Sequence, residues 1–423
     1  MKPPRWIERT PKEQKNVQKH MAECLNFLRS FPLTYFDSDV DQVPIAYRII
    51  TLSNEIPIKT SNRVKLVLLT GYNETIDKYC EFIRELLLRS SEHLSEHLTI
   101  YIMDHRGQGV SGREVSVRDE CPLLAHYSSW RYLVKDVAQF VEQVVHPLNK
   151  ELLPSSEVVH LFAHSMGGCI GAHVAAANPT MFASVSLNSP LFRLTLQNPV
   201  LEMIDLLGPL AQIMSCLGYG RSSRNFKDPQ NPELEKQQVI SDMRLCHCYE
   251  RAKWFRKLRV DSFAMSLSSS EDQGEVPHYG ICMTQSFGWF KQIIEAYHEL
   301  PNVVENIGCR VIIFQAEDDV LVSSRQINKI GELIPQCTVL KVGHGSFHEA
   351  HFGGEDKVKD LILSTILQNI CGVKKIMKFP KSYLICDDDD EKMLSHSKFK
   401  WCIILSFVVA AAAAVSIPLL MYA

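Results

Sequence analysis

The chain of 423 residues lacks three features, and each absence argues against a class of protein. No apolar stretch follows the basic residues near the N-terminus, so we expect no secretory signal peptide. The 13 cysteines are odd in number and follow no framework spacing, which indicates reduced thiols rather than a disulfide scaffold. The formal net charge is −3 and no long basic face is visible, so nucleic acid is not an expected partner.

Paired metal-ligand motifs are absent as well. The densest group of cysteine and histidine is Cys246-His247-Cys248, and no second ligand pair accompanies it at the spacing of a structural zinc site. We therefore expect no metal site. The sequence contains no internal repeat, and it gives no indication of an oligomeric state.

The C-terminal segment 401–423 contains no charged residue. As a helix rising about 1.5 Å per residue it would span roughly 35 Å, which is enough to cross the core of a bilayer. Lys398 and Lys400 lie just before it, in agreement with the bias of positive residues toward the cytosolic side. The pattern predicts a transmembrane helix that anchors the protein to a membrane, with the preceding part of the chain facing the cytosol.

Short apolar runs alternate with helical patterns through most of the chain. This alternation is typical of an α/β protein with a mostly parallel sheet and helices on both faces. Helical spacing of apolar residues follows several of the runs. The apolar runs that predict strands are 66–69, 98–103, 158–162, 183–187, 311–314 and 338–342.

The alternation stops between about residues 190 and 300, which indicates an insertion. An insertion after a strand falls at the carboxyl edge of the sheet, where such folds bind ligands, and so it predicts a lid. We expect six segments: a basic lead-in, the first part of the core, the lid, the second part of the core, a charged linker and the membrane anchor. Their predicted bounds are 1–30, 31–190, 191–300, 301–372, 373–400 and 401–423.

Ser165 is the candidate nucleophile. It directly follows a predicted strand and precedes a helix of small residues, an arrangement that forces a nucleophile into a sharp turn. Gly167 and Gly168 let strand and helix approach closely, whereas Ala163 replaces the usual first glycine. The start of the helix directs free N–H groups toward the serine, so the N–H of Met166 is expected to be one oxyanion donor.

The second oxyanion donor is expected in the loop after the first core strand, at Tyr72. A serine also needs a histidine base and a carboxylate that orients it, in the chain order serine, acid, histidine. Candidates for the acid follow the strand at 311–314, where Asp319 is preferred to Asp318 by its distance from the small Ala316. Candidates for the base follow the last strand: His344, His348 and His351. His164 is expected to pack beneath the nucleophile.

Several segments resemble the lysophospholipase L2 and monoacylglycerol lipase group of α/β-hydrolases. They are Leu161 to Gly168 (LFAHSMGG), Asp104 to Arg113 (DHRGQGVSGR) and Leu187 to Pro190 (LNSP). The loop 71–79 is similar to the oxyanion loop of the group, although Thr70 stands where monoacylglycerol lipases have a histidine. The acid loop 315–322 and the pair His348-Glu349 are similar too, which places the acid at Asp319 and the base at His348.

The resemblance covers about residues 30–370 and implies an α/β-hydrolase fold. It also implies a serine hydrolase that cleaves a carboxylic ester of a lipid, a lysophospholipid or a monoacylglycerol, through an acyl-enzyme and without a cofactor. The same scaffold supports acyl thioesterases and serine peptidases, so both stay open. From another class, a non-catalytic binding protein of this fold is the alternative, which the presence of all three catalytic candidates disfavours.

Overall fold

The structure is a computed structural model of the whole chain. It describes residues 10–52, 63–93, 97–114, 124–146, 158–194, 245–246, 248–268, 284–343, 346–353 and 356–371. The predicted linker and tail, at 373–400 and 401–423, lie outside these residues, as does most of the predicted lid.

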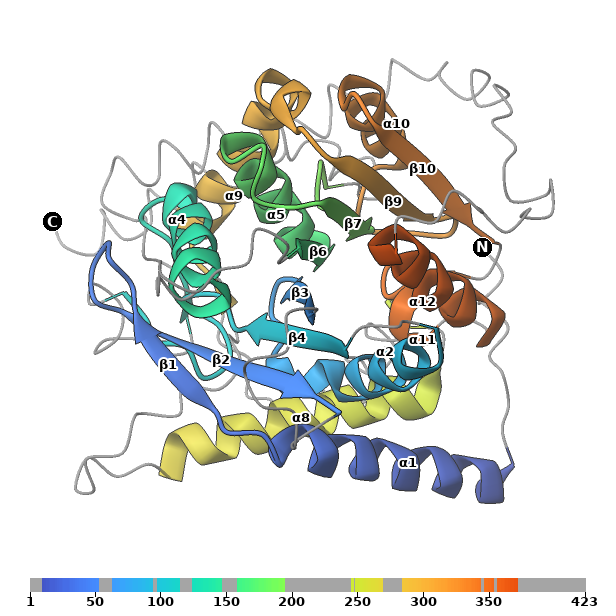
Figure 1. Cartoon of the computed structure of the whole chain (residues 1–423). Helices are drawn as coiled ribbons and strands as arrows, with labels where there is room; N and C mark the ends of the chain where they lie inside the picture. The colour runs from blue at the N-terminus through green and yellow to red at the C-terminus, as the bar shows by residue number, and fades with distance from the viewer. Residues whose placement is uncertain are drawn as a thin grey trace, which may run out of the picture.

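An eight-stranded sheet forms the centre of the molecule (Figure 1), in the order β1-β2-β4-β3-β6-β7-β9-β10. From β4 to β10 neighbouring strands are parallel, whereas β2 pairs antiparallel with β4 and with β1. The predicted mostly parallel sheet is thus confirmed. The strands are β1 (Thr34–Asp37), β2 (Pro44–Thr51), β3 (Arg63–Leu69), β4 (His97–Met103), β6 (Val158–His164), β7 (Ser184–Asn188), β9 (Arg310–Ala316) and β10 (Cys337–Val342).

Helices cover both faces of this sheet, as Figure 1 shows. One side carries α4 (Trp130–Phe140), α5 (Ser165–Ala177), α9 (Phe287–Glu299) and α10 (Ser324–Leu333), and the other carries α1 (Pro11–Arg29), α2 (Cys80–His93), α8 (Tyr249–Ser268), α11 (Ala350–Gly353) and α12 (Asp356–Cys371). Shorter elements are η1 (Ile76–Tyr79), η2 (Val141–Val145), η5 (Leu300–Asn302), η6 (Val304–Asn306), β5 (Leu124–Ala125) and β8 (Thr284–Gln285).

The central strands explain why two faces need covering. Successive side chains of a strand point to opposite faces. In β3, Val67 and Leu69 belong to the core cluster on the α5 side, whereas Leu66 and Leu68 belong to the cluster on the α2 side. A strand that is apolar at every position must be buried on both faces, which is how the continuous apolar runs predicted a doubly covered sheet.

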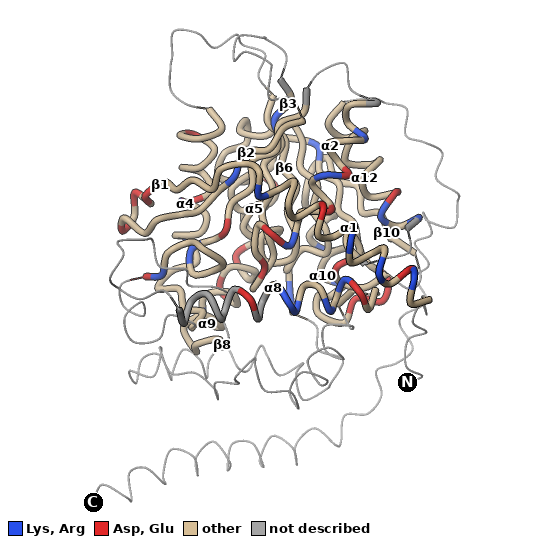
Figure 2. The backbone as a smooth tube through the Cα atoms, turned by 90° about the horizontal axis from the view of Figure 1, so that it is seen from below, with Lys and Arg blue, Asp and Glu red and all other residues tan. Residues whose placement is uncertain are grey.

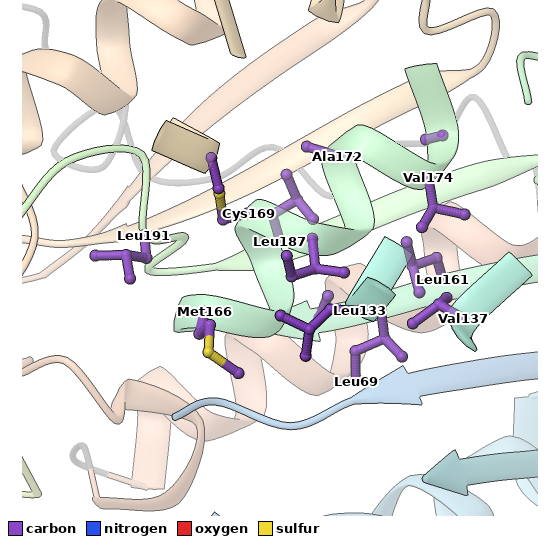
Figure 3. Close-up of a cluster of buried hydrophobic side chains, with 14 of the residues drawn as sticks. Leu69, Leu133, Val137, Leu161, Met166, Cys169, Ala172, Val174, Leu187 and Leu191 are labelled. Carbon is purple, nitrogen blue, oxygen red and sulfur yellow. The ribbon is translucent and has the colours of Figure 1, made fainter. Parts of the chain in front are cut away.

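Tight packing between β6 and α5 holds the candidate nucleophile at the edge of the sheet. Figure 3 shows this cluster, in which Leu161 of β6 and Leu187 of β7 lie near Ala172 and Val174 of α5. All four side chains are buried. The helix is rich in glycine and alanine, so its backbone approaches the sheet closely.

The structure corrects the predicted fold class in one element. Among the described residues, no helix is long and apolar enough to cross a membrane. The longest of them, α1 and α8, carry charged residues along their length, and Figure 2 shows both signs along α8. This finding contradicts the transmembrane element of the predicted fold, and with it the predicted single-pass membrane anchor and localisation. The segment 401–423 on which that prediction depended lies outside the described residues.

The predicted lid contributes α8 and α9 to the described structure. Helix α8 begins at Tyr249 and ends at Ser268. A buried, bidentate ion pair fixes its first turn to α2, with Arg251 Nε and Nη2 each 2.7 Å from the carboxylate of Glu81. The described part of α8 is therefore attached to the core.

Candidate active site

Ser165 occupies a strained turn between β6 and α5. Its φ angle is +50°, in the left-handed region that residues with a side chain rarely adopt. The preceding His164 is still extended, with φ −115° and ψ 139°, so the chain changes direction at the serine. Such strain persists only where the surroundings hold it, and it is common at catalytic residues.

Glycines on the helix side make this turn possible. A Cβ at Gly167 would lie 2.4 Å from the carbonyl oxygen of Thr70, and one at Gly168 would lie 2.8 Å from Cβ of Pro190. On the strand side, the methyl of Ala163 lies 3.3 Å from where a Cβ of Gly171 would be. The helix glycine at 171 thus leaves room for an alanine at the position where the motif usually has glycine.

Ser165, His348 and Asp319 form one hydrogen-bonded chain. His348 Nε2 lies 2.8 Å from Ser165 Oγ, and His348 Nδ1 lies 2.8 Å from Asp319 Oδ2. The three residues follow the carboxyl ends of β6, β10 and β9, which meet at one edge of the sheet. The structure therefore brings the predicted nucleophile, base and acid together.

Burial separates the two acid candidates. Asp319 is 8% exposed, and its Oδ1 accepts hydrogen bonds from the backbone N–H groups of Leu321 at 2.8 Å and Val322 at 3.1 Å. Asp318 is exposed. Burial by itself would raise the pKa of Asp319, but the charge of His348 and the two N–H donors hold it below its usual value. This carboxylate is thus kept ionised beside the histidine.

Of the three candidate bases, only His348 is seen beside Ser165 in the described part of the chain. Burial would lower the pKa of His348, but the neighbouring Asp319 carboxylate raises it above 6.5. His351 is fully buried beneath the site, where its ring centroid lies 4.4 Å from that of His164. His344 lies outside the described residues.

Asn188, the last residue of β7, holds the histidines beneath the nucleophile. Its side-chain nitrogen lies 3.0 Å from Nδ1 of both His164 and His351, and donates to the carbonyl of His348 at 3.4 Å. Burial lowers the pKa of His164 to about 3, so this ring stays neutral at ordinary pH. The prediction that His164 packs below the turn agrees with this placement. Asn188 itself was not singled out from the sequence, because its partners come from β6, the loop after β10 and α11.

The predicted oxyanion donors come from two segments, the start of α5 and the loop between β3 and η1. Met166 is buried in the first turn of α5, where helical N–H groups have no partner within the helix. Tyr72 lies in the loop between β3 and η1, and it lines the same cavity as Ser165. Its ring centroid lies 4.4 Å from that of Trp289.

Side chains outside the predicted set hold this loop in place. The side chain of Gln108 accepts a hydrogen bond from Asn73 N–H at 2.5 Å and donates one to the Gly71 carbonyl at 3.2 Å. It therefore holds the backbone on both sides of Tyr72. Glu74 accepts from Gly71 N–H at 2.6 Å and from the Tyr79 hydroxyl at 2.5 Å. The sequence contained a signal for this role of Gln108, since it lies in the DHRGQG loop that resembles the family.

Lys78 links the oxyanion loop (residues 71–79) to the loop that carries His348 and Glu349, the histidine loop. Its Nζ lies 2.7 Å from Glu74 Oε1 and 2.6 Å from Glu349 Oε1, and the side chains of all three are largely buried. Burial would lower the pKa of Lys78, but the two carboxylates raise it. Burial would likewise raise the pKa of Glu74, but Lys78 holds it at about 2. One ammonium thus neutralises part of the charge of two carboxylates next to His348.

A cavity of about 250 Å³ opens onto Ser165 and His348. Most of the wall is apolar, and the polar residues gather near the oxyanion loop and Lys78. The apolar lining residues are Tyr72, Leu191, Leu194, Leu245, Phe255, Leu258, Trp289, Leu321 and Val322. A mostly apolar cavity with a few polar groups beside a nucleophile suits a substrate with an apolar portion.

One further group carries metal-ligand atoms. Ligand atoms of His20, Glu81 and Glu85 lie within 4.8 Å of one another. The carboxylate of Glu81 is already paired with Arg251, and Lys359 Nζ lies 2.7 Å from Glu85. Because these cations already compensate the acidic charge, we assign no metal to this group.

Comparison with known proteins supports the same family. The model of the Hydrolase_4 family, described as serine aminopeptidase, S33, matches residues 60–355. The chain is 25% identical over 349 residues to a probable lysophospholipase L2 of Haemophilus influenzae, which covers 82% of this chain and 94% of that protein. It is 31% identical over 134 residues to lysophospholipase L2 of Escherichia coli K12, covering 32% of this chain and 34% of that protein.

Two solved structures share the fold. A soluble variant of monoglyceride lipase from Saccharomyces cerevisiae, in complex with a substrate analogue, has a TM-score of 0.53 at 15% identity, covering 81% of this chain and 96% of that one. A carboxyl esterase from Bacillus coagulans, in complex with glycerol, has a TM-score of 0.51 at 15% identity, covering 81% and 98%. The family model spans most of the chain, so the chain belongs to the Hydrolase_4 family, and the predicted resemblance to lysophospholipase L2 is confirmed.

Proposed function

We propose that this serine hydrolase cleaves the carboxylic ester of a lipid with one acyl chain, a lysophospholipid or a monoacylglycerol. The hydrogen-bonded chain from Ser165 through His348 to Asp319, at the floor of a mostly apolar cavity, is the observation that carries the proposal. The similarity to lysophospholipase L2 supports the choice of a lipid ester.

The proposed reaction has two halves. His348 Nε2 takes the proton of Ser165 as its Oγ attacks the carbonyl carbon, and then gives that proton to the leaving alcohol. Water then attacks the acyl-enzyme and loses a proton to His348, which gives this proton to Ser165 Oγ as the bond to the acyl group breaks and the fatty acid leaves. Asp319 orients the imidazole through Nδ1 and stabilises its charged form.

In both halves the carbonyl oxygen becomes negatively charged. We assign the stabilising donors to the backbone N–H groups of Met166 and Tyr72, one at the helix start and one in the loop clasped by Gln108. Donors held by a fixed backbone need no rearrangement when the charge forms, and each is worth about 3 kcal/mol in comparable enzymes.

A second candidate is hydrolysis of an aminoacyl substrate, because the family description names an aminopeptidase. Such an enzyme needs a carboxylate that receives the substrate ammonium. Glu74 and Glu349 line the cavity, but both are within 2.7 Å of Lys78. The site already holds its own ammonium there, which favours the ester.

The test compares purified protein and Ser165→Ala on lysophospholipids, monoacylglycerols, acyl thioesters and aminoacyl amides. We expect the wild type to hydrolyse a single-chain lipid ester faster than the thioesters and amides, and Ser165→Ala to lose both this activity and labelling by a fluorophosphonate. Faster cleavage of an aminoacyl amide would reject the lipid assignment, and labelling that survives Ser165→Ala would reject the nucleophile.

A further inference from the structure

Leu258 lines both the catalytic cavity and a second cavity of about 270 Å³. The second cavity is a groove between α1 and α8, lined by the 22, 25, 26 and 29 positions of α1 and the 254, 257, 258 and 261 positions of α8. Both sets have helical i, i+3, i+4, i+7 spacing, so each helix presents one face to the groove. Among the described residues that line either cavity, Leu258 alone lines both.

We infer that Leu258 determines the length of acyl chain that the enzyme accepts, and that a long chain continues past it into the groove between α1 and α8. This inference rests on the proposed function, because it assigns part of a lipid substrate to the path. A chain that ends before Leu258 fits within the catalytic cavity. A longer chain needs the space on the groove side of the leucine side chain.

The inner wall of this path is apolar and its outer rim in the groove is polar, an arrangement that suits an acyl chain whose far end approaches solvent. On the catalytic side, Phe255 and Leu245 line the same cavity as Leu258. On the groove side, Leu25 is 8% exposed and Trp254 is half-buried. The polar members of the groove, Asn26, Arg29, Lys257 and Asp261, are exposed, so they form its outer rim. Burying apolar chain along such a path contributes about 0.8 kcal/mol per methylene.

The position of Leu258 is set by contacts elsewhere on α8. Two turns earlier, Arg251 is bound through two hydrogen bonds to Glu81 of α2. One turn earlier, the Phe255 ring lies 4.8 Å from the ammonium of Lys78. The helix is therefore attached to the core in the two turns before Leu258, and we expect a change in the volume of residue 258 to alter the path more than the placement of α8.

The experiment measures kcat/KM for octanoyl- and palmitoylglycerol and compares the ratio between variants. Leu258→Ala opens the path past this position and is expected to raise the palmitoyl-to-octanoyl ratio about tenfold, the effect of roughly one or two methylenes in an apolar site. Leu258→Trp closes it and is expected to lower the ratio about tenfold. On the groove side, Ala22→Phe fills the path from α1 and is expected to lower the ratio as well.

Asn16→Phe is the matched control, because it adds the same ring at an exposed position of α1 that lies off the face formed by positions 22, 25, 26 and 29. It is expected to leave the ratio unchanged. Fluorophosphonate labelling of Ser165 reports whether each variant folds. If Leu258→Trp does not fold, the two single variants Ala22→Phe and Leu258→Ala are sufficient for the test. Unchanged ratios in those two variants would overturn the inference while leaving the proposed function intact. A wild type that is labelled but cleaves neither lipid would overturn both.

Discussion

The Nε2 atom of His348 lies 2.8 Å from the Oγ of Ser165, although the two residues are 183 positions apart in the chain. The distance is that of a hydrogen bond, so the proton of the serine can pass to the histidine without rearrangement. The contact depends on β6 and β10 ending at the same edge of one sheet. Four predictions concern this pair and the residues that hold it in place.

Replacing Asp319 should remove most of the activity, because its carboxylate holds the tautomer and orientation of His348. For Asp319→Asn we expect kcat to fall by about 10⁴-fold, the loss seen when this carboxylate is replaced in a serine protease. Steady-state hydrolysis of a soluble ester measures it. Asp318→Asn is the matched control, since its side chain is exposed, and we expect a change of less than about twofold. The opposite ranking would move the acid to Asp318.

Activity should depend on the protonation of His348. A protonated imidazole cannot accept the serine proton, and Asp319 raises the pKa of His348 above 6.5. We therefore expect kcat/KM to rise with pH through an apparent pKa above 6.5, and to be lost as the pH falls below it. In Asp319→Asn the labelling rate should follow a lower pKa, because burial then acts without the opposing charge. A pKa that does not move would show that another group controls the profile.

Lys78 should matter for stability as well as rate, because it is the shared cation of two buried carboxylates. Lys78→Met would leave Glu74 and Glu349 facing each other, and we expect unfolding to become easier by about 3 to 5 kcal/mol. Urea unfolding measures this change. Lys357→Met is the control on the exposed surface of α12, where we expect less than about 0.5 kcal/mol.

Additional loss of kcat in Lys78→Met would show that the oxyanion and histidine loops depend on this link. Equal stabilities for the two methionine variants would instead show that the carboxylates take up protons or water without cost.

The strain at Ser165 should be measurable as stability. Glycine adopts a φ of +50° freely, whereas alanine does not, so Ser165→Gly should be more stable than Ser165→Ala by about 1 kcal/mol. Both variants lose the nucleophile and should be inactive. Thermal unfolding of the pair isolates the backbone effect, and a glycine variant less stable than the alanine variant would contradict it.

Much of the core could be predicted from the sequence because its signals are local. Apolar runs such as 66–69 and 158–162 predicted buried parallel strands, and both lie at the centre of the sheet. The turn at Ser165 was equally local, since its strand, small residues and helix are adjacent in the chain. The antiparallel pair β1 and β2 was not predicted, because short strands at a sheet edge are identified by their partners rather than by a long apolar run.

The sequence by itself determined the strand–turn–helix at Ser165, the doubly covered sheet and the family to which they belong. Only the tertiary structure decided which side chains meet there. Asp318 and Asp319 are neighbours with the same chemistry, and what separates them is that one is buried against His348 and the other is exposed. Distant segments are likewise joined by the hydrogen bonds of Gln108, by the ion pairs of Lys78 and by the packing of Leu258. These contacts act through space rather than along the chain, so the sequence did not predict them.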